Sequence, residues 1–120
     1  MAHVMLPGSA PAKELQKTKY ATNAALRMLE MMAEAGSSVE DIEVCLVGAG
    51  NVLKKADDTI CKENSRSIIE FLGDRGIPIR ASVLGGIKRK GVFLDIESGR
   101  ITYSEGDSRE KLLWEAEAVD

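Results

Sequence analysis

The residues best suited to covalent chemistry in this sequence of 120 residues are its one histidine, His3, and its two cysteines, Cys45 and Cys61. A thiol becomes a nucleophile once a neighbouring base has removed its proton, and histidine is a common base for this purpose. Neither cysteine lies at metal-ligand spacing, and no second histidine or carboxylate cluster lies near His3. We therefore expect neither a metal nor another cofactor.

Cys61 is the better placed of the two cysteines. A helix is predicted to begin near Asp58 or Thr59, either of which could accept a hydrogen bond from an amide of the first turn. Cys61 then falls at the helix N-terminus, where the positive end of the helix dipole can lower the pKa of a thiol. Its position on the apolar face favours a buried structural cysteine instead. Cys45 falls within a predicted strand and is the weaker candidate.

Two other stretches could be taken for binding sites. The run Gly48-Ala49-Gly50-Asn51 follows a predicted strand, but it lacks the third glycine of a dinucleotide fingerprint and the ending of a P-loop. It is therefore interpreted as a structural turn. The basic run Lys88-Arg89-Lys90 is interpreted as a solvated loop, although it could also face an acidic partner.

The hydrophobic pattern predicts the elements that must position these residues. Apolar residues at three- and four-residue steps predict a helix from about Thr18 that ends at Gly36. A second helix ends at Gly73 or Gly76. Alternating apolar residues predict strands over 42–47, 77–83, 92–96 and 101–103, the last two joined by a hairpin around Gly99, with Pro78 at a strand start or edge. The segment 108–118 has helix-compatible spacing.

This order predicts an α+β layer fold with a mixed or largely antiparallel sheet. With 44% hydrophobic and 29% charged residues, the chain has the size and composition of one soluble globular domain, residues 1–120. The net charge of −3 argues against nucleic acid and anionic membranes as main partners. No signal-peptide pattern and no apolar stretch of membrane-spanning length is present, so we expect a cytoplasmic protein without membrane insertion.

Four segments of the chain together form a recognisable pattern. They are Ala2-His3-Val4-Met5-Leu6-Pro7, then Lys19-Tyr20-Ala21, then Leu46-Val47-Gly48-Ala49-Gly50-Asn51, and finally Gly76-Ile77-Pro78-Ile79 with Leu84-Gly85-Gly86, Val92-Phe93-Leu94 and Ser98-Gly99-Arg100-Ile101. Taken together, they resemble the CheD family of chemoreceptor glutamine deamidases from bacterial and archaeal chemotaxis, and the resemblance covers about residues 1–104. Residues 105–120 are expected to form a C-terminal extension, for which a helix is one possibility.

The resemblance implies a cysteine-hydrolase fold of layered mixed β-sheets flanked by helices. It also implies a mechanism in which a cysteine thiolate attacks a glutamine side-chain amide and a histidine moves the protons. His3 falls on the family's histidine position. The family's nucleophile belongs to a Gly-Ser-Cys type motif upstream of that histidine, which would precede Met1. We therefore expect these 120 residues to be a shortened form with impaired or absent activity, with Cys61 as an unfavourable substitute nucleophile.

The resemblance implies helices of a chemoreceptor as the partner. An alternative is a non-catalytic binding module for a chemoreceptor or for a CheC-type phosphatase, and a third possibility is an unrelated α+β protein. A layered sheet without an N-terminal strand would expose an edge that another chain could cover. A homo-oligomer is therefore possible.

Overall fold

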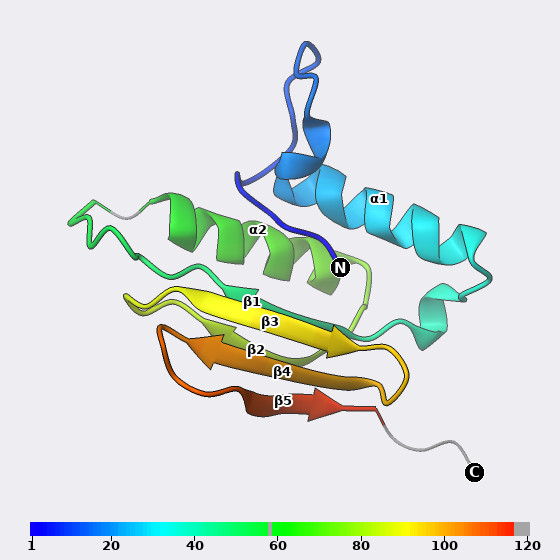
Figure 1. The fold of residues 1–120 in the computed structure, drawn as a ribbon. Helices are drawn as coiled ribbons and strands as arrows, with labels where there is room; N and C mark the ends of the chain where they lie inside the picture. The colour runs from blue at the N-terminus through cyan, green and yellow to red at the C-terminus, as the bar shows by residue number, and fades with distance from the viewer. Residues whose placement is uncertain (58, 117–120) are drawn as a thin grey trace. The chain divides into compact units, whose positions relative to one another are not determined.

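The computed structural model describes residues 1–57 and 59–116 (Figure 1). Two helices and five strands follow in the order α1 (Ala21–Glu34), β1 (Val44–Gly48), α2 (Ile60–Asp74), β2 (Ile79–Leu84), β3 (Lys90–Asp95), β4 (Arg100–Glu105) and β5 (Lys111–Glu115). Short 3-10 turns, η1 (Lys17–Lys19) and η2 (Val39–Asp41), precede α1 and β1. The predicted α+β class with layered, mixed sheets is confirmed.

The chain forms two compact units, each built from two stretches of sequence. Unit 1 consists of Met1–Glu43 and Asp57–Pro78, and unit 2 of Val44–Ala56 and Ile79–Asp120. That residues 1–120 make up a single domain stays a prediction.

Unit 1 is built on the contact between α1 and α2. All the apolar side chains of the described residues that are buried lie in this unit: Ala21, Ala24, Ile42, Phe71, Leu72 and Ile77. The small side chains of α1 let the two helices approach closely, since the distance between packed helices depends on the side chains at the contact. The first helix begins at Ala21 instead of about Thr18, because the preceding residues form the tighter turn η1.

Both helices of unit 1 end in the same way. After α1, the amide of Gly36 donates to the Ala33 carbonyl at 3.0 Å, and the amide of Ser37 donates to the Met32 carbonyl at 2.9 Å. This is the Schellman arrangement, which requires a residue of positive φ, and Gly36 supplies it at 98°. Gly76, at φ 67°, ends α2 with equivalent bonds. The predicted stop at Gly36 is confirmed, and of the two glycines proposed for α2 it is Gly76 that acts.

The predicted cap of α2 is wrong for Thr59. Its side chain makes no capping hydrogen bond, because its own backbone is already helical, with φ −89° and ψ −39°. A capping residue normally has an extended backbone that turns its side-chain oxygen over the first amides. The other residue proposed for this cap, Asp58, lies outside the described residues.

Unit 2 consists of two sheets. Strands β1 and β2 pair in parallel from Val44–Ile79 to Gly48–Leu84, with an irregularity between Val44 and Cys45. The other sheet is antiparallel, in the order β3-β4-β5. Strand β1 contacts β3, and β2 contacts β5, so the two sheets form layers within this unit.

The C-terminal segment is a strand and not the helix expected from its sequence. Residues Lys111–Glu115 form β5, which pairs with β4 from Arg100–Glu115 to Tyr103–Lys111. Leucine and tryptophan suit a strand as well as a helix, and a stretch this short takes the structure that tertiary pairing offers. The end of the expected helix, residues 117 and 118, lies outside the described residues.

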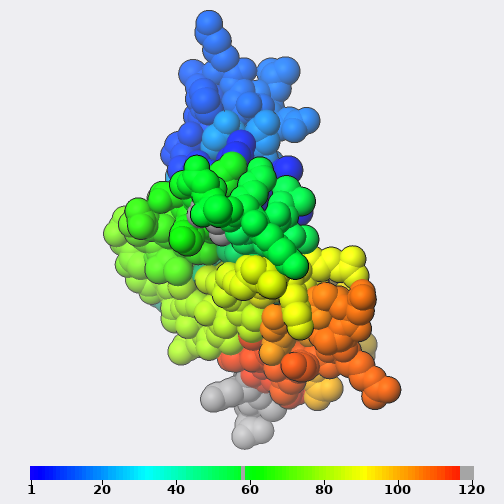
Figure 2. All heavy atoms as spheres, turned by 90° about the vertical axis from the view of Figure 1, so that its left-hand side faces the viewer, coloured from blue at the N-terminus to red at the C-terminus, as the bar shows by residue number. Residues whose placement is uncertain are grey.

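The turns at one end of unit 2 are joined by backbone bonds. The amide of Gly106 donates to the Arg89 carbonyl at 2.8 Å, and the Arg89 guanidinium lies 2.7 Å from an Asp107 carboxylate oxygen. Figure 2 shows these two turns next to each other, the first in yellow and the second in orange. The basic run therefore forms part of a connected set of turns.

Candidate functional site

The histidine segment, residues 3–8, is bound on one side to the start of α1. The amides of Met5 and Leu6 both donate to the Lys19 carbonyl, at 2.8 and 2.9 Å, and the Leu6 carbonyl accepts from the amide of Ala21 at 2.8 Å. Leu6 thereby forms a parallel bridge with Tyr20. The residue before a proline favours an extended backbone, so Pro7 helps to keep this stretch straight.

On its other side the histidine segment is bound to α2. The Asn64 side-chain amide donates to the Met5 carbonyl at 3.1 Å, and the amide of Gly8 donates to the Ser67 hydroxyl oxygen at 3.0 Å. Each bond joins residues 59 positions apart in the chain. Because Asn64 and Ser67 are three residues apart, they lie on one face of α2. The backbone from Met5 to Gly8 is therefore fixed by two separate parts of unit 1.

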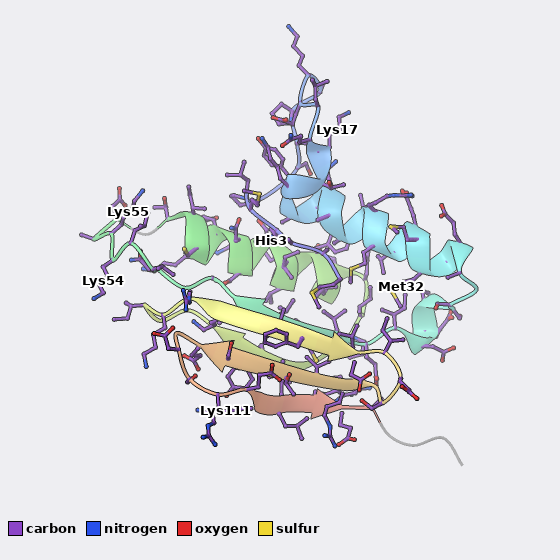
Figure 3. All side chains as sticks on the ribbon, viewed as in Figure 1. His3, Lys17, Met32, Lys54, Lys55 and Lys111 are labelled. Atoms are coloured by element: carbon purple, nitrogen blue, oxygen red, sulfur yellow. The ribbon has the colours of Figure 1, made fainter. Side chains whose placement is uncertain are left out.

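His3 lies two residues before this fixed stretch and is exposed. It is labelled on the N-terminal segment in Figure 3. Within residues 1–57 and 59–116, no hydrogen bond or ion pair to its imidazole is formed. The ring is thus placed by its backbone and is exposed.

The two cysteines lie in different units. Cys61 is the second residue of α2, half-buried, and its carbonyl accepts a hydrogen bond from the Ser65 hydroxyl at 3.3 Å. Cys45 is half-buried in β1 opposite Ala81. Both are thiols and not a disulfide. His3 and Cys61 thus share unit 1 and Cys45 does not, while the catalytic roles of His3 and Cys61 stay predictions.

Asn64 and Ser67 are the residues of this site that the sequence did not reveal. Each joins the helix to a backbone atom far away in the chain, and a local pattern carries no signal for such a bond. The one available sign was two polar residues three positions apart on a helix with an otherwise apolar side. Asn64 has a second unusual property, since its Oδ1 atom is buried and has no hydrogen-bond partner among the described residues.

The loop between the histidine segment and α1 contains an ion pair. The Glu14 carboxylate accepts from the amide of Gln16 at 3.0 Å and lies 3.5 Å from the Lys19 ammonium. The amide hydrogen bond, followed by the charge of Lys19, holds the pKa of Glu14 below its ordinary value. This pair ties the loop to the residue whose carbonyl binds the histidine segment.

The glycine run after β1 serves as a turn packed against a second turn. The amide of Gly85 donates to the Gly48 carbonyl at 3.0 Å, and that of Asn51 donates to the Gly86 carbonyl at 2.8 Å. A Cβ atom at Gly50 would overlap the Lys88 carbonyl oxygen. The Lys90 ammonium donates to the carbonyls of Gly85 and Lys88. Lys90 is also the first residue of β3. The expectation that it belongs to a solvated loop is therefore wrong, because its side chain is bound to the turn.

Across residues 1–57 and 59–116, histidine, cysteine, aspartate and glutamate side chains form no group able to hold a metal ion. Neither α1 nor α2 has the length and apolar character of a membrane-crossing helix.

Comparison with known proteins gives the family. The family described as CheD chemotactic sensory transduction matches residues 5–105. A probable chemoreceptor glutamine deamidase CheD of Chlorobium luteolum is 34% identical over 116 residues, which cover 96% of this chain and 58% of that protein. Its counterpart in Haloarcula marismortui is 30% identical, over 90% of this chain and 64% of that protein. The chemoreceptor glutamine deamidase CheD of Thermotoga maritima is 30% identical, over 93% of this chain and 71% of that protein.

The chain spans less than two thirds of the length of the first two of these relatives. The matched range includes both helices and the first four strands, and it begins two residues after His3. Because the family match covers most of the sequence, this chain belongs to the CheD family.

Proposed function

We propose that this chain takes part in the hydrolysis of glutamine side chains of chemoreceptors to glutamate, with His3 as the residue that moves protons. The observation that carries the proposal is the family match over residues 5–105, together with relatives named chemoreceptor glutamine deamidases. The structure supports it by holding the backbone next to His3 between α1 and α2 while its ring stays exposed.

The proposed reaction needs a thiol and the His3 imidazole in contact with one glutamine. The imidazole takes the thiol proton, and the sulfur forms a bond to the amide carbon. When the carbon–nitrogen bond breaks, the imidazolium gives its proton to the leaving nitrogen and ammonia departs. The imidazole then takes a proton from water, which attacks the thioester, and the protein thiol and a glutamate side chain are released. The base and the acid are thus the same ring at two stages.

The finer part of the proposal is that residues 1–120 do not complete this reaction alone. The family resemblance puts the nucleophile in a Gly-Ser-Cys type motif, which these residues do not contain. Cys61 is half-buried on α2, which favours a structural role for its thiol.

Mass spectrometry of a chemoreceptor methylation-region peptide tests this expectation. After incubation with residues 1–120, the glutamines of the peptide are expected to remain unchanged. The matched variants are Cys61→Ser and Cys45→Ser. Robust conversion of glutamine to glutamate that is lost in Cys61→Ser and kept in Cys45→Ser would show that Cys61 is the nucleophile, and would reverse this part of the proposal.

The role of His3 is tested by supplying the nucleophile. The segment of the Thermotoga maritima relative that precedes its matching region is fused ahead of Met1, and deamidation of the same peptide is measured. We expect conversion that is lost when His3 is replaced by Ala and kept when the neighbouring exposed residue Met1 is replaced by Ala. A fusion protein that folds and converts glutamine equally well with His3→Ala would contradict the assignment.

A non-catalytic binding role is the second candidate, favoured by exposed apolar side chains on the sheet of unit 2. Phe93 and Leu94 of β3 are 48% and 46% exposed. The partners to test in a pull-down are a chemoreceptor fragment and a CheC-type phosphatase, with Phe93→Ser as the variant that should reduce capture. Failure to capture either protein counts against this role. Both proposed roles include a location in the cytoplasm.

A further inference from the structure

Among the described side-chain hydrogen bonds to the N-terminal segment, the bond between Asn64 and Met5 lies nearest to His3 along the chain. The Met5 amide is held by the Lys19 carbonyl, and the Met5 carbonyl is held by the Asn64 side chain. Both polar groups of this one residue are therefore fixed, from opposite directions, two positions after His3. Removing the Asn64 amide would release the Met5 carbonyl, while the Met5 amide would stay bound to Lys19 of η1.

The other half of the Asn64 side chain supports a dedicated role. Its Oδ1 is buried without a partner among the described residues. Buried polar atoms normally have hydrogen-bond partners, and an unpaired one destabilises the fold. An apolar residue of the same shape, such as leucine, would remove that unfavourable atom. The hydrogen bond to the Met5 carbonyl is thus the contact that asparagine makes at this position and that leucine cannot make.

We propose that Asn64 is a positioning residue for His3, acting through the Met5 carbonyl, with Ser67 holding Gly8 one helical turn further on. This inference rests on the proposed function for its catalytic meaning, but its structural content can be measured without any activity. The substitution Asn64→Leu removes the donor and the buried acceptor together. The loss of the hydrogen bond and the removal of the unpaired oxygen act in opposite directions on stability, so the protein should change little in stability while the backbone around His3 becomes more mobile.

The chain provides a matched control. The Asn23 side chain of α1 accepts a hydrogen bond from the amide of Ala10 at 2.8 Å. Asn23 is therefore a second asparagine that binds the backbone of the N-terminal segment. It does so seven positions after His3. Asn23→Leu should loosen the backbone near Ala10 and leave the residues next to His3 as they are.

Nuclear magnetic resonance relaxation of residues 1–120 provides the test. In Asn64→Leu we expect the backbone order parameters of Val4 and Met5 to fall from about 0.85, typical of a rigid backbone, toward about 0.6. The ring signals of His3, the only histidine of the chain, should shift and sharpen as its motion increases. Ser67→Ala should give a smaller change centred on Gly8, and the amides of β3 and β4 report whether each variant is folded.

The positioning role is overturned if Asn64→Leu folds and leaves the order parameters of Val4 and Met5 unchanged, or if Asn23→Leu lowers them equally. Should Asn64→Leu fail to fold, unchanged Gly8 and His3 signals in Ser67→Ala would overturn it instead. In the fusion protein with a supplied nucleophile, Asn64→Leu should lower kcat and leave KM unchanged. If the fusion protein has no activity while the relaxation changes are seen, the proposed function fails and the positioning of His3 stands.

Discussion

At the scale of single residues, Gly50 is held where no side chain fits. Its backbone lies against the Lys88 carbonyl oxygen, which belongs to another turn of unit 2 and is itself bound by the Lys90 ammonium. A methyl group at Gly50 must therefore displace backbone and not the end of a flexible side chain. Gly73, inside α2, is the opposite case, because a Cβ there meets nothing within 4 Å.

The two glycines give opposite expectations for the same substitution. Gly50→Ala should lower the free energy of unfolding by about 1–3 kcal/mol, the usual cost of forcing extra atoms into a packed site. Gly73→Ala should raise it by about 0.5–1 kcal/mol, because alanine favours the helix and reduces the freedom of the unfolded chain. Urea denaturation of the two variants measures both values. A Gly50→Ala protein as stable as the parent would mean that the two turns do not pack as described.

The candidate site shows which residues a sequence can reveal. His3 stood out because it is the only histidine and is followed two residues later by Met-Leu-Pro, which resembles a family motif. Asn64 and Ser67 did not, because their bonds to residues 59 positions away depend on how α2 meets the N-terminal segment. Spacing along a helix identifies a shared face, but it does not identify what that face touches.

At the scale of elements, the hairpin between β3 and β4 depends on one carboxylate. Asp95 accepts hydrogen bonds from the Ser98 hydroxyl at 2.8 Å and from the amide of Glu97 at 3.2 Å. The Ser98 hydroxyl is the main reason that the pKa of Asp95 lies below its ordinary value of 3.8, and the Glu97 amide and the charge of Arg100 lower it further. Gly99, at φ 71°, completes the turn, as the sequence predicted.

The lowered pKa of Asp95 gives the hairpin a pH dependence of known sign. The contribution of the carboxylate to stability is fully present above pH 3.8, the value expected when the chain is unfolded, and is lost as the pH falls through the lower folded value. We expect Asp95→Asn to have a slightly lower Tm than the parent at neutral pH and the two Tm values to converge below about pH 4. Thermal unfolding at several pH values measures this, and Ser98→Ala should reduce the same pH dependence. A constant difference in Tm down to low pH would refute it.

The elements that the sequence predicted correctly are those with a strong local cause. Both helices end at a glycine, Gly36 and Gly76, because the chain needs a residue of positive φ there. The strands β1 to β4 follow from the alternation of apolar and polar residues. Strand β5 could not be predicted in this way. Its apolar residues fit either period, and its pairing with β4 decides the outcome. The start of α1 was placed too early for a related reason, because residues before it form the separate 3-10 turn η1 and Tyr20 between the two has an extended backbone.

At the scale of the whole molecule, association with a second copy is the remaining prediction from the sequence. In the antiparallel sheet of unit 2, β3 pairs with β4 on one side, and among the described residues it contacts β1 without forming a strand pair with it. Backbone groups that a strand leaves unpaired are templates for pairing with another chain, and a lysine on such a strand suppresses this pairing.

Light scattering after size-exclusion chromatography tests this association. We expect a dimer at high protein concentration and a shift toward monomer in Leu94→Lys, which puts a charge on β3. The control is Leu15→Lys, since Leu15 is 96% exposed in the loop before α1 and should not affect the equilibrium. A monomer at all concentrations, or equal effects of the two lysines, would remove this prediction.

The division of the chain into two units has a consequence for how such a protein can be inherited. Each unit is made of two separate stretches, so the chain passes from one unit to the other three times, after Glu43, Ala56 and Pro78. Recombination between genes at a single point exchanges everything on one side of that point. No single crossover can therefore transfer either unit complete and alone, and new combinations must instead arise by substitutions that suit both units at once.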